Sequence, residues 1–116
     1  MSGFFFVAAG GALGAAGRYA VSLLPYTGSF PVLTLLTNFA GALLIGFIVG
    51  VGGSRNATLF WKTGVCGGFT TFSSFMNENF VLLREQNYLY FMSYTVLSIV
   101  LGLTAVYVGH LIVKAL

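Results

Sequence analysis

Charged residues are scarce in this chain of 116 residues, at 6% of the sequence against 58% for hydrophobic residues. A soluble domain carries roughly 25% charged residues, so this composition excludes an ordinary soluble fold. Nucleic-acid binding is excluded as well, because the net charge of +3 comes from five scattered basic residues and not from a basic patch. The sequence therefore predicts an integral membrane protein whose surroundings are the lipid bilayer.

Reactive residues are also few. The sequence has no aspartate, its only acids are Glu78 and Glu85, and it has one cysteine, Cys66, and one histidine, His110. A single cysteine excludes a disulfide framework within one chain, and so small a set of ligands excludes a multi-ligand metal cluster. No nucleophile–base pair can be drawn from these residues either. We therefore expect that the protein is not an enzyme.

Long apolar stretches fill most of what remains. Four of them suit membrane-spanning helices, each of which needs about 20 residues. We expect these helices near residues 4–24, 31–52, 59–83 and 88–114, in a single transmembrane domain over residues 1–116. An even number of spans places both termini on one side. The expected fold class is an all-α integral membrane protein with four transmembrane helices.

The third apolar stretch contains a polar segment that runs Gly67-Gly68-Phe69-Thr70-Thr71-Phe72-Ser73-Ser74-Phe75. Each of the two adjacent glycines lowers helix propensity by about 1 kcal/mol. Irregular backbone at membrane depth is tolerated only where it is buried in protein or lines a wet cavity. We expect helix 3 to be broken between Gly67 and Thr71, with free carbonyl groups before the break and free N–H groups after it. The alternative is a continuous helix whose hydroxyls bond back to the preceding turn.

Aromatic and hydroxyl side chains beyond this break suggest an ion path. A helix places Phe72 and Phe75 on one face, where the positive ring edges attract an anion. The hydroxyls of Ser73 and Ser74 can donate hydrogen bonds to the same anion. Weak, multiple sites of this kind suit conduction, because the ion must be able to leave. Simple core packing of the two phenylalanines is the alternative.

Further polar groups lie on the other expected helices. Asn38 can donate to an anion or to a broken backbone, or join two helices. Arg18 keeps its charge. It could snorkel to the interface, cap a neighbouring helix or attract anions at a pore mouth. Glu78 opposes anions unless it is protonated or paired. Tyr94 and Ser98 are four residues apart and put two hydroxyls on one helix face.

Four motifs resemble those of the Fluc (CrcB) family of small fluoride channels, over essentially the whole chain. They are residues 10–19, residues 37–41, residues 64–75 and Glu78, and the third is the most specific. The resemblance implies an antiparallel, dual-topology homodimer with two fluoride pores. It also implies passive export of cytoplasmic fluoride, fluoride resistance, and a place in the bacterial inner (plasma) membrane.

The resemblance assigns the pore residues. Phe72 and Phe75 would line the pore, and Asn38 would be an essential polar group nearby. A track of hydroxyls that hydrogen-bonds fluoride would consist of Ser73, Ser74, Tyr94 and Ser98. Two positions depart from the family pattern. Met76 stands where members often have serine, so the track is expected to be less polar there. Gly102 stands where some members carry a hydroxyl, which leaves that end of the track open.

The resemblance also implies a structural ion. A Na⁺ at the dimer interface would be held by the backbone carbonyls of Gly67 and Thr70 from each subunit. Arg18, Glu78 and Thr71 would take vestibule or structural positions.

Two other functions remain open from the residues alone. A proton-coupled exporter of the small multidrug-resistance type needs an intramembrane acid, and Glu78 is the sole candidate because the first helix offers only Arg18. A non-transporting membrane assembly subunit would explain the many glycines. It would not explain the hydroxyl-rich segment.

The basic residues predict insertion in both orientations. Arg55, Lys62 and Lys114 belong to one side and Arg18 and Arg84 to the other, a division too even for the positive-inside rule to select one orientation. We expect dual topology, which favours pairing of the chain with itself over pairing with a paralogue. Cysteine accessibility of the chain expressed alone, measured from both sides of the membrane, tests this. Labelling from one side only would contradict it.

Overall fold

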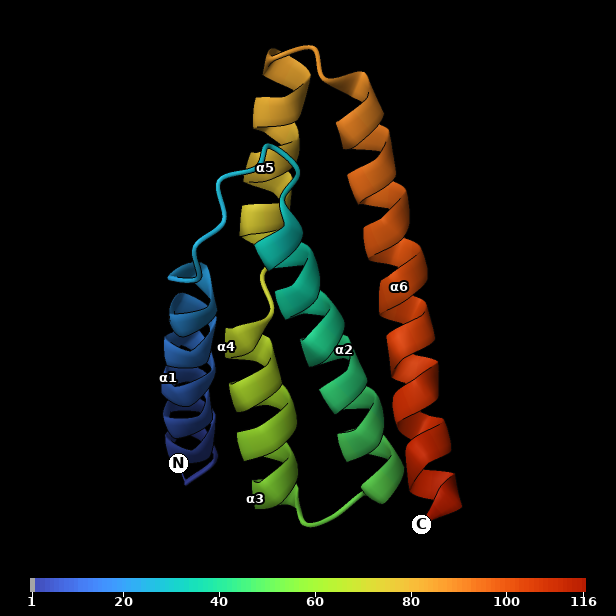
Figure 1. The fold of residues 1–116 in the computed structure, drawn as a ribbon. Coiled ribbons are helices and arrows are strands. Elements are labelled where there is room, and N and C mark those ends of the chain that lie inside the picture. The colour runs from blue at the N-terminus through green and yellow to red at the C-terminus, as the bar shows by residue number, and fades with distance from the viewer. Residues whose placement is uncertain (1) are drawn as a thin grey trace.

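A computed structural model describes residues 2–116, which form helices and connecting segments with no strand. Three helices are long and apolar enough to cross a membrane: α1 (Ser2–Ser22), α2 (Val32–Val51) and α6 (Tyr88–Ala115). Both chain ends and the turn after α2 lie at the same end of the molecule (Figure 1). These features describe a multi-pass membrane protein.

The remaining helical segment, between α2 and α6, is interrupted. It is composed of α3 (Arg55–Thr58), the π-helix η1 (Leu59–Cys66), α4 (Gly67–Phe69) and α5 (Phe72–Arg84). Thr70 and Thr71 between α4 and α5 have extended backbone, with ψ angles of 156° and 113°. The break therefore lies at the end of the stretch indicated by the sequence, and Gly67 and Gly68 are themselves helical.

Glycines bring α1 into close contact with η1 and α4. A Cβ atom on Gly10 would collide with the backbone of Gly64, and a Cβ atom on Gly14 would collide with the backbone of Val65. Gly68 lies as closely on the Gly11 carbonyl. Small residues spaced in this way let helix backbones approach each other in lipid. Gly68, one of the two glycines before the break, thus serves helix packing on α1.

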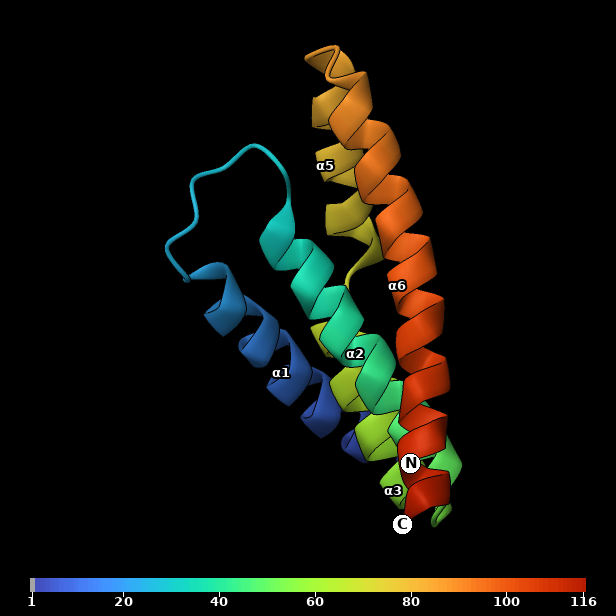
Figure 2. The same cartoon turned by 45° about the vertical axis from the view of Figure 1, so that its right-hand side comes forward.

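A second glycine-mediated pair joins α2 and α6. A Cβ atom on Gly46 would meet the Val106 carbonyl group, and one on Gly109 would meet the Leu43 carbonyl group. Beyond this pair, the last turns of α5 and the first turns of α6 extend past the ends of α1 and α2 (Figures 1 and 2). The interruption at Thr70 and Thr71 lies between these two helix pairs and the start of α5.

The packing predicts that Gly14→Ala lowers the free energy of unfolding by about 1–3 kcal/mol, because the added methyl group meets immobile backbone. Gly11→Ala is the matched control, since a Cβ atom there has no neighbour within 4 Å. Both substitutions gain about 1 kcal/mol of helix propensity, so the difference between them isolates the collision. Thermal unfolding of the two purified variants in detergent measures it, and equal stability would contradict this packing.

Candidate functional site

The interruption is closed by a side chain of α2. Asn38 Nδ2 donates to Thr71 O at 3.2 Å, and Thr71 N donates to Asn38 Oδ1 at 2.8 Å. One side-chain amide thereby pairs with both backbone polar groups of Thr71, which a continuous helix would have satisfied itself. Of the roles that the sequence leaves open for Asn38, the structure shows the bond to the broken backbone.

Arg18 and Thr70 donate hydrogen bonds to carbonyl groups near the end of η1 and in α4. Arg18 Nε donates to Gly68 O at 3.1 Å, so this arginine caps a neighbouring helix. Thr70 donates twice to Cys66 O, from its backbone N at 3.0 Å and from its hydroxyl at 2.8 Å. The last turn before the break is therefore held from α1 and from its own threonine.

Thr71 starts the helix that follows the break. Its hydroxyl accepts a hydrogen bond from Ser74 N at 3.0 Å, which is the usual N-cap arrangement. The same hydroxyl lies 3.2 Å from Ser73 Oγ, and Ser73 is exposed. Thr71 thus has a structural role at this point through both its peptide group and its side chain.

A groove of about 470 Å³ lies beside the interruption, and we call it the central groove. Its lining includes the following residues from the sequence-based assignment: Asn38, Gly67, Thr70, Thr71, Phe72, Phe75 and Ser98. The Phe72 and Phe75 rings have centroids 6.2 Å apart at 50°. Ser98 Oγ is buried and has no hydrogen-bond partner among residues 2–116. The groove therefore combines two aromatic rings with a serine whose buried hydroxyl has no partner among residues 2–116.

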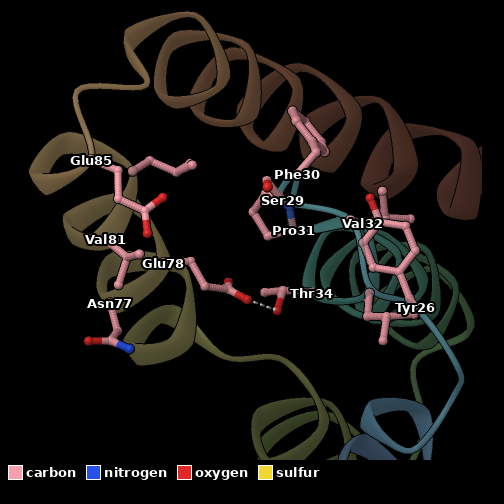
Figure 3. A pocket seen from close by; sticks show the side chains of 13 residues that line it. Tyr26, Ser29, Phe30, Pro31, Val32, Thr34, Asn77, Glu78, Val81 and Glu85 are labelled. Atoms are coloured by element: carbon pink, nitrogen blue, oxygen red, sulfur yellow. Dashed lines mark hydrogen bonds between the residues drawn. The ribbon is translucent and has the colours of Figure 1, made fainter.

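Glu78 joins three helices at a second cavity of about 350 Å³, which we call the Glu78 cavity. Its carboxylate accepts from Thr34 Oγ1 and from the Tyr94 hydroxyl, each at 2.8 Å. Figure 3 shows the bond from Thr34 across the cavity. Tyr94 is fully buried, with Phe75 against its ring at 5.0 Å. The Tyr94 hydroxyl is thus committed to Glu78 in this structure.

Arg18 and a group of hydroxyls line a third cavity, of about 140 Å³, which we call the Arg18 cavity. The hydroxyl-bearing residues in its lining are Tyr19, Ser22, Thr34, Thr37, Thr71 and Ser74. Thr34 also lines the Glu78 cavity, so the two cavities share a wall. A fixed cation surrounded by hydrogen-bond donors suits a small anion.

The sequence assigned no role to Thr34 or Thr37, although the structure places both at these cavities. Thr37 is buried with 4% exposure, and Thr34 bonds Glu78. Their spacing puts them with Asn38 on one face of α2. Three polar residues within five positions of an apolar helix were the signal that could have identified this face.

The bonds to Thr71 predict that Asn38→Ala destabilises the protein by about 1–3 kcal/mol, since it leaves an N–H and a C=O group without their partners. Asn77→Ala removes the same side chain from an exposed position on α5 and is expected to change stability by less than about 0.5 kcal/mol. Unfolding midpoints in detergent compare the variants. Equal midpoints would show that other groups satisfy the broken backbone.

Comparison with known proteins gives a consistent result. A family model described as "CrcB-like protein, Camphor Resistance (CrcB)" matches residues 5–110. A relative from Flavobacterium psychrophilum named fluoride-specific ion channel FluC is 43% identical over 100% of both chains. A protein of the same name from Chlorobium phaeobacteroides is 41% identical, over 98% of this chain and 94% of its own. FluC 2 of Bacillus subtilis is 43% identical, over 87% of this chain and 82% of its own. The chain therefore belongs to the CrcB family.

Proposed function

We propose that this chain is a fluoride-specific ion channel through which cytoplasmic fluoride leaves the cell passively and which thereby gives fluoride resistance. Hydrogen fluoride crosses membranes as a neutral acid and dissociates inside, so a channel for the anion returns it down its gradient. The full-length relatives named fluoride-specific ion channels support this function. So does the interrupted helix, because it brings aromatic rings and a free hydroxyl to an open groove. This is the chemistry of a channel and not of an enzyme.

The observation that carries the proposal is the arrangement around Asn38. Because the Asn38 amide satisfies the broken backbone, Phe72, Phe75 and Ser98 are left to line the central groove. Ring edges and a hydroxyl donor can replace part of the water around a small anion without fixed charge. Interactions of this strength let the ion leave again, as conduction requires.

The Arg18 and Glu78 cavities suit entry and exit of the anion. The Arg18 guanidinium keeps its charge at all physiological pH values, and the Ser74 and Thr37 hydroxyls lie around it. The Glu78 carboxylate would repel fluoride if it were free. Its two oxygens instead accept from Thr34 and Tyr94, which offsets part of its charge.

The proposal includes an antiparallel homodimer of dual topology with two pores. The protomer has four spans, the third consisting of α3, η1, α4 and α5, and it lies in the bacterial inner membrane. The exposure of Phe72 supports the dimer: 73% of this proposed pore side chain is uncovered in one protomer. A second chain against the groove would enclose it.

The end of α4 suits the structural Na⁺ of such a dimer. Thr71 N, which would bond Gly67 O in a continuous helix, donates to Asn38 instead. Ser74 N likewise donates to the Thr71 hydroxyl and not to Thr70 O. Carbonyl oxygens freed by unwound helix coordinate Na⁺ in other transport proteins. Gly67 and Thr70 would hold the ion, which would supply positive charge between the two interruptions.

Fluoride efflux from liposomes tests the function. Purified protein reconstituted into vesicles loaded with potassium fluoride is expected to release fluoride when a potassium ionophore removes the opposing voltage, as followed with a fluoride electrode. Chloride-loaded vesicles should release almost nothing. Absence of fluoride efflux, or equal release of chloride, would contradict the proposal.

Two variants test the site within the same assay. Phe72→Ile and Asn38→Ala are each expected to lower the efflux rate about tenfold or more, which corresponds to the loss of about 1.4 kcal/mol of ion stabilisation. Size-exclusion chromatography should still show dimers. Wild-type rates in both variants would remove these residues from the pore.

A further inference from the structure

We infer that Lys62 forms an access site for small monovalent anions at the end of the central groove nearer the chain termini. This inference rests on the proposed channel function and deepens it. Lys62 lies in η1, which precedes the interruption, whereas Arg18 acts at the end of α4. The two basic residues would therefore serve different parts of the ion path.

Among residues 2–116, Lys62 is the only charged side chain that lines the central groove. Both acids of the chain, Glu78 and Glu85, line the separate Glu78 cavity. The Glu78 oxygens accept from Thr34 and Tyr94. No acid that lines the groove neutralises the Lys62 charge, so the groove has an uncompensated positive end.

The π-helix sets the position of Lys62. Gly67 N donates to both Gly64 O and Lys62 O, the latter five residues earlier, so Lys62 and Gly67 lie on adjacent turns. Lys62, Cys66 and Gly67 all line the groove. Gly67 also keeps this face open, because a Cβ atom there would have only the Lys62 carbonyl oxygen near it, at 4.0 Å. The register of η1 thus places Lys62 on the groove-lining side of the helix that precedes the interruption.

Lys62 lies within the interrupted helical segment, seven positions after Arg55, the first residue of α3. Ionisable side chains within a membrane usually face a cavity and mark an ion pathway. The Lys62 ammonium group and the Ser98 hydroxyl, which has no partner among residues 2–116, are both hydrogen-bond donors. This pair selects a small anion, and in a conducting channel that anion is fluoride.

The expected effect is a rate enhancement that depends on ionic strength. A positive groove raises the local anion concentration, and the screening length falls from about 30 Å at 0.01 M salt to about 3 Å at 1 M. Lys62→Met keeps the apolar stem of the side chain and removes its charge. It should lower fluoride efflux about fivefold at 0.01 M and less than about twofold at 1 M of an impermeant salt.

Two further variants complete the experiment. Lys62→Arg keeps the charge and should conduct at the wild-type rate. Arg55→Met removes a positive charge from the same end of the molecule but lines a different cavity, with Phe4 and Val7, and should also match the wild type. Lys62→Gln provides a second neutral variant in case Lys62→Met fails to reconstitute.

The outcomes are distinguishable. If the wild type releases no fluoride, the channel function fails and the Lys62 site fails with it. If the wild type conducts and both neutral Lys62 variants conduct equally well at low salt, the Lys62 site alone is wrong. An equal loss at both salt concentrations would also overturn it, since an anchoring or packing role of the side chain does not depend on screening.

Discussion

The centre of this molecule depends on the exchange of hydrogen bonds between the Asn38 side chain and the Thr71 peptide. An unsatisfied peptide group in hydrocarbon costs several kcal/mol, so a spanning helix can be interrupted only where another group replaces its partners. Asn38 does this from α2. The exchange diverts Thr71 N from Gly67 O and allows the Thr71 hydroxyl to begin a new helix. The position of Phe72, the first residue of α5, follows from where this new helix begins.

The interrupted backbone also needs tightly packed helices around it. Two glycine-mediated contacts provide this packing. One joins α1 to η1 and α4, and the other joins α2 to α6. Because lipid gives no hydrophobic drive between helices, close backbone contact is what stabilises such pairs. α5 has no glycine contact of this kind. It is joined to α2 and α6 through Glu78, whose bonds to Thr34 and Tyr94 span all three helices.

The sequence predicts the interruption because glycines and hydroxyls are unusual in an apolar helix. The sequence misplaces the residues that unwind. Gly67 and Gly68 have low helix propensity yet are helical, and Gly68 packs against α1 through a contact that only the fold reveals. The role of Asn38 was undecidable from its chemistry, because an amide serves an ion or a peptide equally well. Thr34 was missed for a related reason: its partner, Glu78, is 44 positions away.

One consequence of the extended pair Thr70 and Thr71 concerns acidity. The interruption divides one long helix dipole into two, so the negative end of the first part faces the positive end of α5 within the membrane. Each end carries about half an elementary charge. These charges belong to peptide groups, which do not titrate in the biological range. The part of the electric field that comes from these two helix ends is therefore unchanged in acidic surroundings, where hydrogen fluoride enters cells fastest.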